Sequence, residues 1–473
     1  MKTLNRSTHT SLSLTTRILQ FGEGNFLRAF VDWMVHEMNT AHGYASGVAV
    51  IQPIDRGMVQ VLAQQGGLYH HVMQGVEAGE TVDKIVLNDS IQQAINPFED
   101  EGGFFALAES EDVKLVFSNT TEAGIQFNSD DHPMDGLAIT FPGKLTQWLH
   151  RRFEQLGDSE SSELGVVPCE LIEANGDKLK SCIQEYATLW KLGGDFQDWL
   201  GRRVHFANTL VDRIVPGYPK AEMTEIKSRM GFEDQLVVKS ETFHLFVLEG
   251  DDFLQEHFPA HRYGFNVKYV DSIAPYRTQK VRILNGAHTS MVPVGLLSGL
   301  ATVRETVEDP VVGEFVRQCI FDEIVPTISL PDEDPKVFAE QVLSRFANPF
   351  IRHELIAISL NSISKWRVRV LPTVLDFLDT KGTLPKRLVF SLAALIQLHL
   401  SGDFQLKDDE EVLAFFGDLR TQQLTGGDAT MQVLKNESLW GQNLTAIDGF
   451  VDLVSECLES ISTTSIASAL SRL

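Results

Sequence analysis

The first half of the chain alternates short apolar runs with stretches of helical spacing. The runs, rich in β-branched residues, read RILQF (17–21), GVAVIQP (47–53), VKLVFSN (113–119) and LGVVPCEL (164–171). Between them, residues 28–39 and 141–153 repeat apolar positions every three or four residues, which is typical of amphipathic helices. Strands that alternate with helices predict a parallel sheet covered on both faces, because a parallel crossover usually needs a helix. We therefore expect a Rossmann-like, doubly wound α/β domain.

From about residue 280 onward the pattern changes to long helical periodicity. Examples are VVGEFVRQCIFDEIV (311–325) and EVLAFFGDL (411–419), and strand-like runs are few. A chain of 473 residues also exceeds what one hydrophobic core usually organises. We expect two domains, an α/β domain over residues 1–275 and a mostly α-helical domain over residues 276–473.

Acidic residues outnumber basic residues 64 to 40, which gives a formal net charge of −24. This charge argues against nucleic acids and anionic membranes as partners, because both need a cationic surface. The four cysteines form no C-x-x-C pair, so the sequence indicates neither a disulfide framework nor a cysteine metal site. The N-terminal segment is polar, and no stretch of about 18 apolar residues occurs. We expect a soluble, cytoplasmic protein.

The segment RILQFGEGNFLRAF (17–30) places two glycines between the first apolar run and the first helical stretch. Glycine allows a tight turn and a close approach of the backbone to a ligand, and free N–H groups at a strand-to-helix turn favour a dinucleotide diphosphate. Gly22 and Gly24 would begin a G-x-G-x-x-G motif, but Leu27 stands at its third glycine. An ordinary tight turn is therefore the alternative. A second strand within about 30 residues favours the dinucleotide site.

The acid expected to bind the ribose of that dinucleotide is Asp55, just beyond the second apolar run. Arg56 follows it, and an arginine at this place could instead hold the 2′-phosphate of NADP. Between these alternatives we expect NAD as the cofactor.

A second informative segment, QKVRILNGAHTS (279–290), contains Lys280, Asn285 and His288. On an α-helix Asn285 and His288 share a face, whereas Lys280 and Asn285 diverge by more than about 90°. The three side chains would then converge only if Lys280 lies at or before the start of the helix. The alternative is a lysine on a solvated face and a histidine with a structural role.

Five segments together carry a resemblance to a known family. They are FGEGNFLRAF (21–30), SNTTEAGI (118–125), PCELIEANGDKLK (168–180), VDRIVPGYP (211–219) and the K-x4-N-x2-H spacing of residues 280–288. In this order the chain resembles the polyol-specific long-chain dehydrogenases, the mannitol dehydrogenase family. The resemblance covers most of the chain and implies an NAD-dependent oxidoreductase.

The resemblance also implies roles for residues at matching positions. Lys280 would be the general acid or base, and Asn285, His288 and Asn175 would orient the substrate and polarise its reacting oxygen. These residue types suit hydride transfer to a ketone, since negative charge builds on the oxygen and needs donors and a proton source in place. The cofactor-binding residues that it implies are Phe21, Gly22, Gly24, Asn25, Phe26, Asp55 and Asn119.

Three further positions bear on the predicted substrate. Glu170 and Leu171 stand where the polyol enzymes have an aspartate and an asparagine, a departure that we associate with a uronate branch of the family. Asp212 would line the substrate pocket or, alternatively, form an ion pair with a neighbouring helix.

The scheme requires no metal ion, and the sequence contains no H-E-x-x-H motif or cysteine cluster to bind one.

A sugar acid needs a cation for its carboxylate, and residues 348–372 contain Arg352, Lys365, Arg367 and Arg369. An arginine can bind a carboxylate through two parallel hydrogen bonds. On the family resemblance, Lys365 and Arg369 are the expected substrate-binding pair. The alternative for each is a surface charge paired with a nearby acid.

Three alternatives to a uronate reductase remain. A relative that reduces a different keto acid, or one that acts on a neutral polyol, would share the fold and the lysine. A nucleotide-sensing binding protein would keep the glycine turn without turnover. The sequence does not determine the oligomeric state, although the resemblance is compatible with a monomer. For Cys169, His70 and His71 we expect packing or polar-surface roles.

Overall fold

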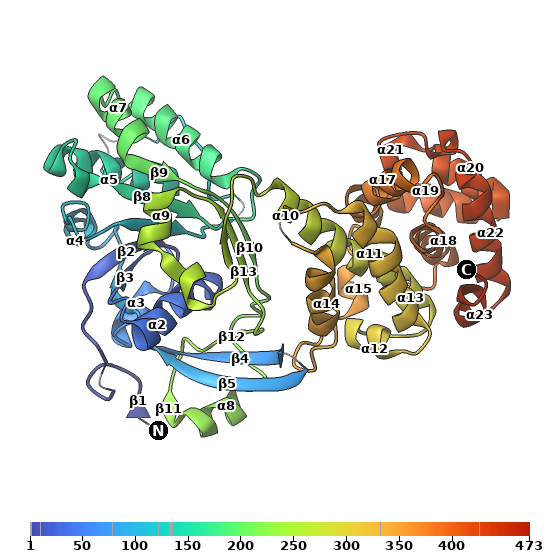
Figure 1. Ribbon diagram of the computed structural model, residues 1–473, viewed down its shortest axis with the longest axis horizontal. Coiled ribbons are helices and arrows are strands. Elements are labelled where there is room, and N and C mark those ends of the chain that lie inside the picture. Colours follow the sequence, from blue (N-terminus) through green and yellow to red (C-terminus); the bar gives the residue numbers. More distant parts are fainter. Residues whose placement is uncertain are drawn as a thin grey trace. The chain divides into compact units, whose positions relative to one another are not determined.

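The computed structural model describes residues 2–9, 11–77, 79–121, 123–131, 136–331, 333–424 and 426–473. The chain forms two compact units, unit 1 (Met1–Ile273) and unit 2 (Ala274–Leu473) (Figure 1). The strands formed by the described residues all belong to unit 1, and the elements described in unit 2 are helical.

A six-stranded parallel sheet is the centre of unit 1. Its strands are β2 (Thr16–Phe21), β3 (Gly47–Ile51), β6 (Ile91–Ile95), β7 (Leu115–Ser118), β8 (Leu164–Pro168) and β9 (Val204–Phe206), in the spatial order β6-β3-β2-β7-β8-β9. Numbered along the chain, this is the 3-2-1-4-5-6 order of the Rossmann fold, so the predicted doubly wound domain is confirmed. The order reverses between β2 and β7, and such sheets bind ligands outside the carboxyl ends of the strands at this point.

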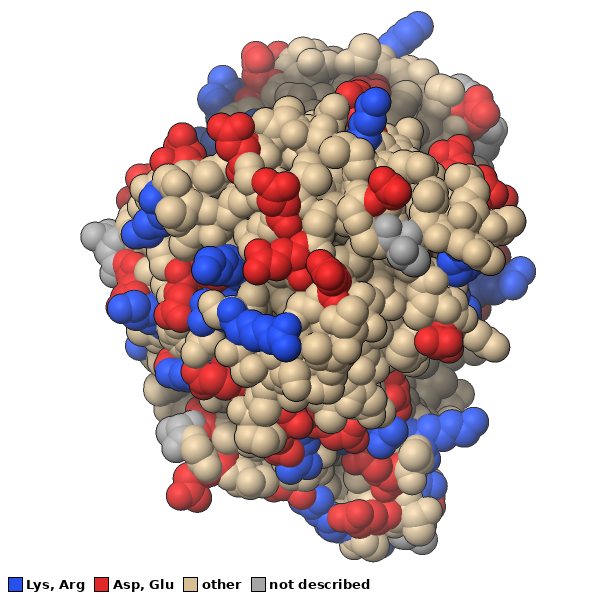
Figure 2. Space-filling model, turned by 90° about the vertical axis from the view of Figure 1, so that its right-hand side faces the viewer, with Lys and Arg blue, Asp and Glu red and all other residues tan. Residues whose placement is uncertain are grey.

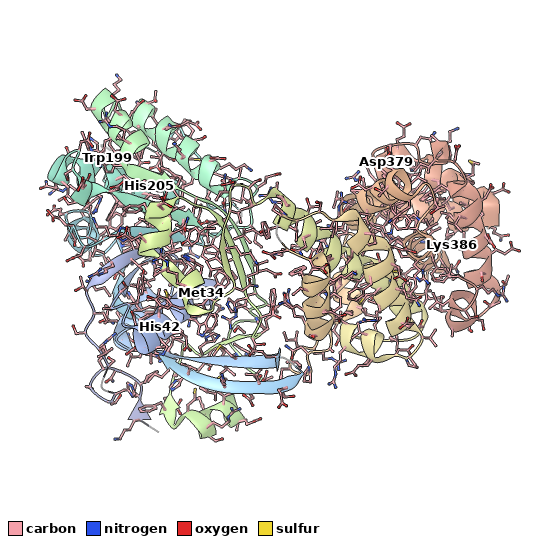
Figure 3. All side chains as sticks on the ribbon, viewed as in Figure 1. Met34, His42, Trp199, His205, Asp379 and Lys386 are labelled. Atoms are coloured by element: carbon pink, nitrogen blue, oxygen red, sulfur yellow. The ribbon has the colours of Figure 1, made fainter. Side chains whose placement is uncertain are left out.

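Alternate residues of the central strands enter two separate hydrophobic cores. In β3, Val48 enters one core and its neighbour Ala49 enters the other. Met34 lies in the same core as Val48, and Trp199 lies in the same core as Ala49 (Figure 3). The first core is covered by α2 (Val31–His42), and the second by α5 (Phe141–Leu156), α6 (Asn175–Leu189) and α7 (Gly194–Arg203). Both faces of the sheet are therefore buried, as a parallel sheet requires.

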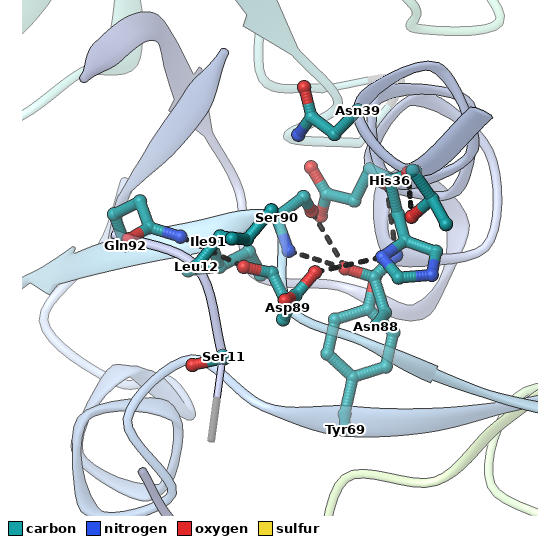
Figure 4. Close-up of polar contacts among 12 residues, drawn as sticks. Ser11, Leu12, His36, Asn39, Tyr69, Asn88, Asp89, Ser90, Ile91 and Gln92 are labelled. Atoms are coloured by element: carbon teal, nitrogen blue, oxygen red, sulfur yellow. Dashed lines mark hydrogen bonds and ion pairs between the residues drawn. The ribbon is translucent and has the colours of Figure 1, made fainter. Parts of the chain in front are cut away.

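The described residues of unit 1 also form smaller sheets, which the sequence pattern did not predict. The first joins β4 (Tyr69–Glu77), β5 (Glu80–Asn88) and β12 (Val238–Ser240), the second β10 (Asn208–Asp212), β13 (Leu245–Glu249) and β14 (Val267–Tyr269), and the third β1 (Lys2–Thr3) and β11 (Phe232–Glu233). The turn between β5 and β6 is tied to α2, because Asp89 Oδ1 lies 2.9 Å from His36 Nδ1 (Figure 4). Within that turn, Asn88 Oδ1 accepts hydrogen bonds from Ser90 N and Oγ.

His70 and His71 lie on β4 and have structural partners. His70 Nδ1 lies 2.9 Å from Asp234 Oδ2, and His71 Nε2 lies 2.7 Å from Ser240 Oγ. Both histidines are buried, and Asp234 also accepts a hydrogen bond from Leu236 N. These contacts agree with the packing role expected for the two histidines.

The remaining helices of unit 1 are short. They are α1 (Asn25–Arg28), α3 (Val59–Gln64), α4 (Glu101–Ala106), α8 (Met223–Met230), α9 (Asp252–His257) and the 3₁₀ helices η2 (Glu160–Ser162) and η3 (Pro259–Tyr263).

Unit 2 is built around α18 (Lys386–Ser401), which packs against α11 (Ala287–Leu297) and α22 (Phe450–Thr463). Its other helices are α10 (Ala274–Gln279), α12 (Val303–Glu308), α13 (Val312–Gln318), α14 (Pro335–Phe346), α15 (Leu355–Ile358), α16 (Ser362–Arg369), α17 (Leu371–Lys381), α19 (Glu410–Thr421), α20 (Gly426–Lys435), α21 (Glu437–Trp440), α23 (Ile466–Leu470), the π-helices η4 (Lys280–Gly286) and η5 (Cys319–Ile324), and the 3₁₀ helices η6 (Val325–Thr327) and η7 (Leu444–Ala446). The predicted change to a mostly helical second half is confirmed. Among the described residues, no helix has the length and apolar character needed to cross a membrane.

Candidate functional site

The turn between β2 and α1 contains two glycines, each with its own structural reason. Gly22 has a φ of +113°, and a Cβ there would lie 2.8 Å from the backbone oxygen of Asn119, so a side chain does not fit. Gly24 directly precedes α1, and no atom lies within 4 Å of the place where its Cβ would be. The backbone is therefore open at Gly24, at the carboxyl end of β2, where a diphosphate can approach.

Arg28 fixes the shape of this turn from inside the protein. The residue is 1% exposed, and its Nε donates a hydrogen bond to Glu23 O at 3.1 Å. Its Nη2 donates to Asn25 Oδ1 at 2.8 Å, and its Nη1 donates to Leu236 O. Burial lowers the pKa of the guanidinium. Arg28 thus holds Asn25, one of the predicted cofactor residues, in place.

Phe21 and Phe26, also predicted as cofactor residues, pack through their side chains. The ring of Phe21 is buried, with its centroid 4.9 Å from that of Phe141. Phe26 stacks on Phe30 with ring centroids 4.9 Å apart. The backbone of Phe21 accepts a hydrogen bond from Asn119 N at 3.1 Å, which joins the ends of β2 and β7.

Asn119 and Glu170 join the loops after β7 and β8. Asn119 Nδ2 donates to Cys169 O at 2.8 Å. Glu170 is 2% exposed and accepts hydrogen bonds at 2.9–3.0 Å from Ser118 Oγ and from both N and Oγ1 of Thr120. Burial raises the pKa of the Glu170 carboxyl group. The sequence signal for Glu170 was that the polyol enzymes, which this chain resembles, have an aspartate in the same segment.

The predicted ribose-binding acid, Asp55, lies on an exposed loop after β3. Gln52, not an acid, is the first residue beyond the strand, and its side chain folds back onto the loop. The loop is linked to the glycine turn because Met58 N donates to Glu23 Oε1 at 3.1 Å. Asp55 and Arg56 are both exposed, so both side chains are accessible to a ligand.

Asn175 is the first residue of α6 and is fully buried. Its Nδ2 lies 2.9–3.1 Å from three acceptors, which are Pro168 O, Glu170 O and Thr209 Oγ1. Its Oδ1 accepts hydrogen bonds from Thr209 N and Gly176 N at 2.9 Å. Both sides of the amide are thus occupied by unit 1 itself. These contacts favour a positioning role for Asn175 over the contact with the reacting oxygen that the resemblance implies.

The other predicted positions of this region differ in exposure. Asp212 is the last residue of β10 and is 6% exposed. Next to it, Arg213 Nη1 donates to Ala29 O at 2.6 Å, which links the end of β10 to the turn before α2. Leu171 is 64% exposed in the loop after β8.

In unit 2, the segment that begins with Lys280 is the π-helix η4. It continues α10 and runs directly into α11, and it contains both Lys280 and Asn285. In a π-helix residue i bonds to residue i+5, so residues five apart lie on the same side of the helix. Lys280 is therefore preceded by helix α10 and does not lie at the start of a helix, the position for which we expected the three side chains to converge. Lys280 lies within a continuous helix, and the wider turn aligns it with Asn285.

His288 follows on α11 and is kept neutral. It is 8% exposed, and its Nε2 has no hydrogen-bond partner in the described part of the chain. The ring centroid lies 4.3 Å from that of Phe346 and 5.2 Å from that of His353. Burial holds the pKa of His288 well below its usual value. Electrostatic repulsion from His353, Arg345, Arg369 and Lys365 lowers this pKa further.

Lys365 and Arg369 lie four residues apart, on one face of α16. Lys365 Nζ donates to Ile358 O at 2.9 Å, and burial and then Arg369 lower the pKa of Lys365. Burial also lowers the pKa of Arg369, whose side chain has no hydrogen bond or ion pair with the described residues. A Cβ on Gly286 would lie 3.3 Å from Arg369 O, so α16 packs directly against η4. Lys365 and Arg369, the residues predicted to bind the substrate carboxylate, thus lie beside the helix of Asn285.

The other basic residues of this region differ in burial: Arg352 and Arg367 have partners near the surface, whereas Arg345 is buried. Arg352 pairs with Glu354 at 2.5 Å on the surface, and Arg367 Nη1 donates to Ser438 O at 3.4 Å. Arg345, which the sequence analysis missed, is 8% exposed on the last turn of α14, next to the Phe346 that contacts His288. The signal that could have found it was the segment SRFANPFIRHE (344–354), where basic and aromatic residues are interleaved.

The cysteines are buried packing residues. All four are free, and burial raises the pKa of each thiol. For Cys169 the pKa lies well above its usual value, which makes it a weak nucleophile. Within the described ranges, no group of three or more His, Cys, Asp and Glu side chains could hold a metal ion.

Two family models match most of the chain. A family model described as the mannitol dehydrogenase Rossmann domain matches residues 16–261, and one described as the mannitol dehydrogenase C-terminal domain matches residues 272–462. An altronate oxidoreductase of Phocaeicola vulgatus is 43% identical over 471 residues, which is 98% of this chain and 97% of the relative. One of Bacillus subtilis is 43% identical over 448 residues, 94% of this chain and 92% of the relative.

Two solved structures share the fold of the chain. A D-sorbitol dehydrogenase in substrate-free form has a TM-score of 0.77 at 18% identity and covers 97% of this chain and 95% of its own. The Pseudomonas fluorescens mannitol 2-dehydrogenase, in a ternary complex with NAD and D-mannitol, has a TM-score of 0.65 at 20% identity and covers 100% and 99%. At 18–20% identity these two structures show only that the fold is shared. The family models and the relatives that are 43% identical show the family. The chain belongs to the mannitol dehydrogenase family of oxidoreductases.

Proposed function

We propose that the protein interconverts D-tagaturonate and D-altronate by NAD-dependent hydride transfer, in hexuronate catabolism. Altronate oxidoreductases that are 40–43% identical over nearly the whole chain support this substrate. The observation that carries the proposal is the cation cluster beside the neutral His288. There Lys365 and Arg369 lie one helical turn apart, and neither forms an ion pair with an acid among the described residues.

The residues at the turn of Gly22 and Gly24 fit a dinucleotide. The open backbone at Gly24 offers N–H groups to a diphosphate, and Glu170 and Asn119 hold the adjacent loops at the edge where the strand order reverses. NAD, when bound, supplies or accepts the hydride. The NAD in the mannitol 2-dehydrogenase complex supports NAD over NADP, with Asp55 binding the ribose.

Lys280 is the proposed proton donor for ketone reduction and the proton acceptor for alcohol oxidation. Reduction places negative charge on the keto oxygen, which needs a hydrogen-bond donor and a proton. Asn285, aligned with Lys280 by the π-helix, would donate its amide hydrogen to that oxygen. Because His288 is neutral, it would hold a substrate hydroxyl through Nε2 and would not supply the proton.

The carboxylate of the sugar acid would bind to Lys365 and Arg369. Replacing both with alanine should raise the KM for tagaturonate at least tenfold, because the carboxylate would lose a guanidinium and an ammonium partner. The Kd of NADH should stay unchanged. Arg367→Ala, on the same helix but in contact with Ser438, is the matched control and should keep the KM of the wild type. An unchanged KM in the double variant would contradict the proposal.

The alternatives differ in substrate or in turnover. Fructuronate reductase would use the same cations on a different keto acid. Mannitol dehydrogenase acts on a substrate without a carboxylate, so a preference for fructose would leave Lys365 and Arg369 without a role. A nucleotide-sensing binding protein would bind NADH and turn over none of these substrates.

A further inference from the structure

A pocket lies in unit 1, at the amino ends of β2 and β7. It is open, has a volume of about 330 Å³, and its lining includes Arg17, Lys114, Arg262, His257 and Glu256. Arg17 is the second residue of β2, and Lys114 directly precedes β7. The two backbones are joined, because Lys114 N donates to Arg17 O at 2.9 Å. Arg262, from η3, brings a third cation to the same pocket.

This pocket is separate from the proposed dinucleotide site. Gly22 follows Arg17 by five residues along β2, which corresponds to about 16 Å in an extended strand. In a parallel sheet the dinucleotide lies outside the carboxyl ends of the strands. The pocket of Arg17 and Lys114 lies at the opposite edge of the sheet and has no role in the proposed reaction.

The cations of the pocket are not neutralised by ion pairs. Among the described residues, Arg17, Lys114 and Arg262 form no ion pair with an acid. Lys114 Nζ donates to the backbone oxygen of Ser161 at 3.0 Å, and burial lowers the pKa of Lys114. Burial also lowers the pKa of His257; Glu256 opposes this shift, and Lys114 and Arg17 add to it. Glu256 is the acid among the lining residues, while Glu163, Glu111 and Asp112 raise the pKa of Lys114 without forming an ion pair with it.

Such a convergence stands out in a chain with 64 acidic and 40 basic residues. Over the face seen in Figure 2, acidic and basic side chains are interspersed. Like charges held close together cost free energy unless an anion neutralises them. Guanidinium groups match the oxygens of a phosphate bidentately, and the volume falls within the usual range for small-molecule sites. We propose that this pocket binds a small phosphate-bearing anion.

The test uses the full chain saturated with NADH, so that the dinucleotide site is filled. Inorganic phosphate and glucose 6-phosphate are titrated by calorimetry at constant ionic strength. We expect saturable binding to the wild type, and at least tenfold weaker binding to the double variant Arg17→Gln/Arg262→Gln, whose replaced side chains are exposed. The matched control is Arg202→Gln, which removes an exposed arginine from unit 1 and leaves Arg203 paired with Asp158. It should bind like the wild type.

Each outcome bears on the proposal. Tighter binding of glucose 6-phosphate identifies a phosphate ester as the ligand, and tighter binding of inorganic phosphate identifies the free ion. Lack of saturable binding to the wild type, or equal affinity in the double variant, would overturn the proposal. Thermal unfolding checks that the double variant is folded. If it is not, the single variant Lys114→Gln takes its place, with the same expected loss of affinity.

Discussion

Asp32, on α2, is fully buried and linked to the glycine turn through Gln20. Gln20 Nε2 lies 3.1 Å from Gly22 O and 3.2 Å from Asp32 Oδ2, and Asp32 Oδ1 has no partner in the described part of the chain. One long hydrogen bond does not compensate a carboxylate for leaving water. Burial therefore raises the pKa of Asp32 to about 7, although Gln20 and Arg28 oppose the shift.

This shift predicts a dependence of stability on pH. Because the pKa of Asp32 is higher in the folded state than its ordinary value of 3.8, the unfolded chain loses this proton first as the pH rises. The contribution of Asp32 to the free energy of unfolding should therefore fall between about pH 4 and pH 7, by at most about 4 kcal/mol. Asp32→Asn removes the titration, so its advantage over the wild type should grow across this range. Urea unfolding at several pH values measures it, and a difference independent of pH would contradict the account.

Asn175 gives a second prediction at the residue scale. Its amide bridges the end of β8 and the start of β10, so Asn175→Ala leaves several buried groups without partners. The free energy of unfolding should fall by about 3 kcal/mol. Chemical denaturation of the wild type and the variant measures this. A loss of kcat with unchanged stability would instead support direct contact with the reacting oxygen.

The sequence predicted the glycine turn because the backbone freedom of glycine belongs to the residue itself. It did not predict the roles of Glu170 and Arg345, which depend on neighbours far along the chain. Glu170 matters because Ser118 and Thr120 lie within hydrogen-bond distance, and Arg345 because α14 ends beside His288. The local signals, an acid after Cys169 and basic residues interleaved with aromatic ones in residues 344–354, do not identify these distant partners.

Among the elements, α16 carries Lys365 and Arg369, the pair proposed to bind the substrate carboxylate. Its first turn contacts a buried cluster formed by Asp408, Ser362 and His399. Asp408 Oδ2 accepts hydrogen bonds from Ile363 N and Ser362 Oγ, both at 3.2 Å. Ser362 Oγ also lies 3.2 Å from His399 Nε2. Burial lowers the pKa of His399 to about 4, so its ring is neutral at pH 7. Asp408 therefore caps the backbone N–H of Ile363 in the first turn of α16, whose N-cap residue is Asn361.

Removing this cap should disturb the pair that α16 carries. Asp408→Ala is expected to lower the free energy of unfolding by about 1–2 kcal/mol, the usual cost of a lost helix cap. It should also raise the KM for tagaturonate several-fold while leaving the Kd of NADH unchanged. Steady-state kinetics and NADH titration check both effects.

Two variants serve as controls for this prediction. Asp408→Asn keeps an oxygen acceptor and should restore most of the KM, and Asp409→Ala removes the exposed neighbouring acid without removing the cap. An unchanged KM in a destabilised Asp408→Ala would show that the cap supports the fold and does not position the pair.

Periodicity predicted the regular elements and missed the irregular one. The apolar runs became β2, β3, β7 and β8 because buried parallel strands need continuous apolar sequence. The π-helix η4 was missed because the phase of Lys280 was calculated with an α-helical period. Some pairs of the smaller sheets, such as β4 with β12, join distant segments and leave no local pattern, although β4 and β5 are neighbours in the chain.

At the scale of the whole molecule, the proposed roles are divided between two units. Unit 1 carries the glycine turn proposed for NAD, and unit 2 carries Lys280 and the cations proposed for the sugar acid. The change of hydrophobic period along the chain predicted this order, since a parallel α/β sheet and a helical assembly have different sequence patterns. The division predicts that a change at Lys280 strongly lowers kcat without weakening the binding of NADH.

The most direct test of the account is the consumption of NADH at neutral pH with tagaturonate, fructuronate and fructose in parallel, by the wild type and by Lys280→Ala. We predict turnover of tagaturonate by the wild type, a loss of about 10²–10⁴-fold in kcat for Lys280→Ala, and an unchanged Kd of NADH in that variant. Preference for fructose would contradict the proposed substrate. Undiminished turnover by Lys280→Ala would contradict the proposed proton donor.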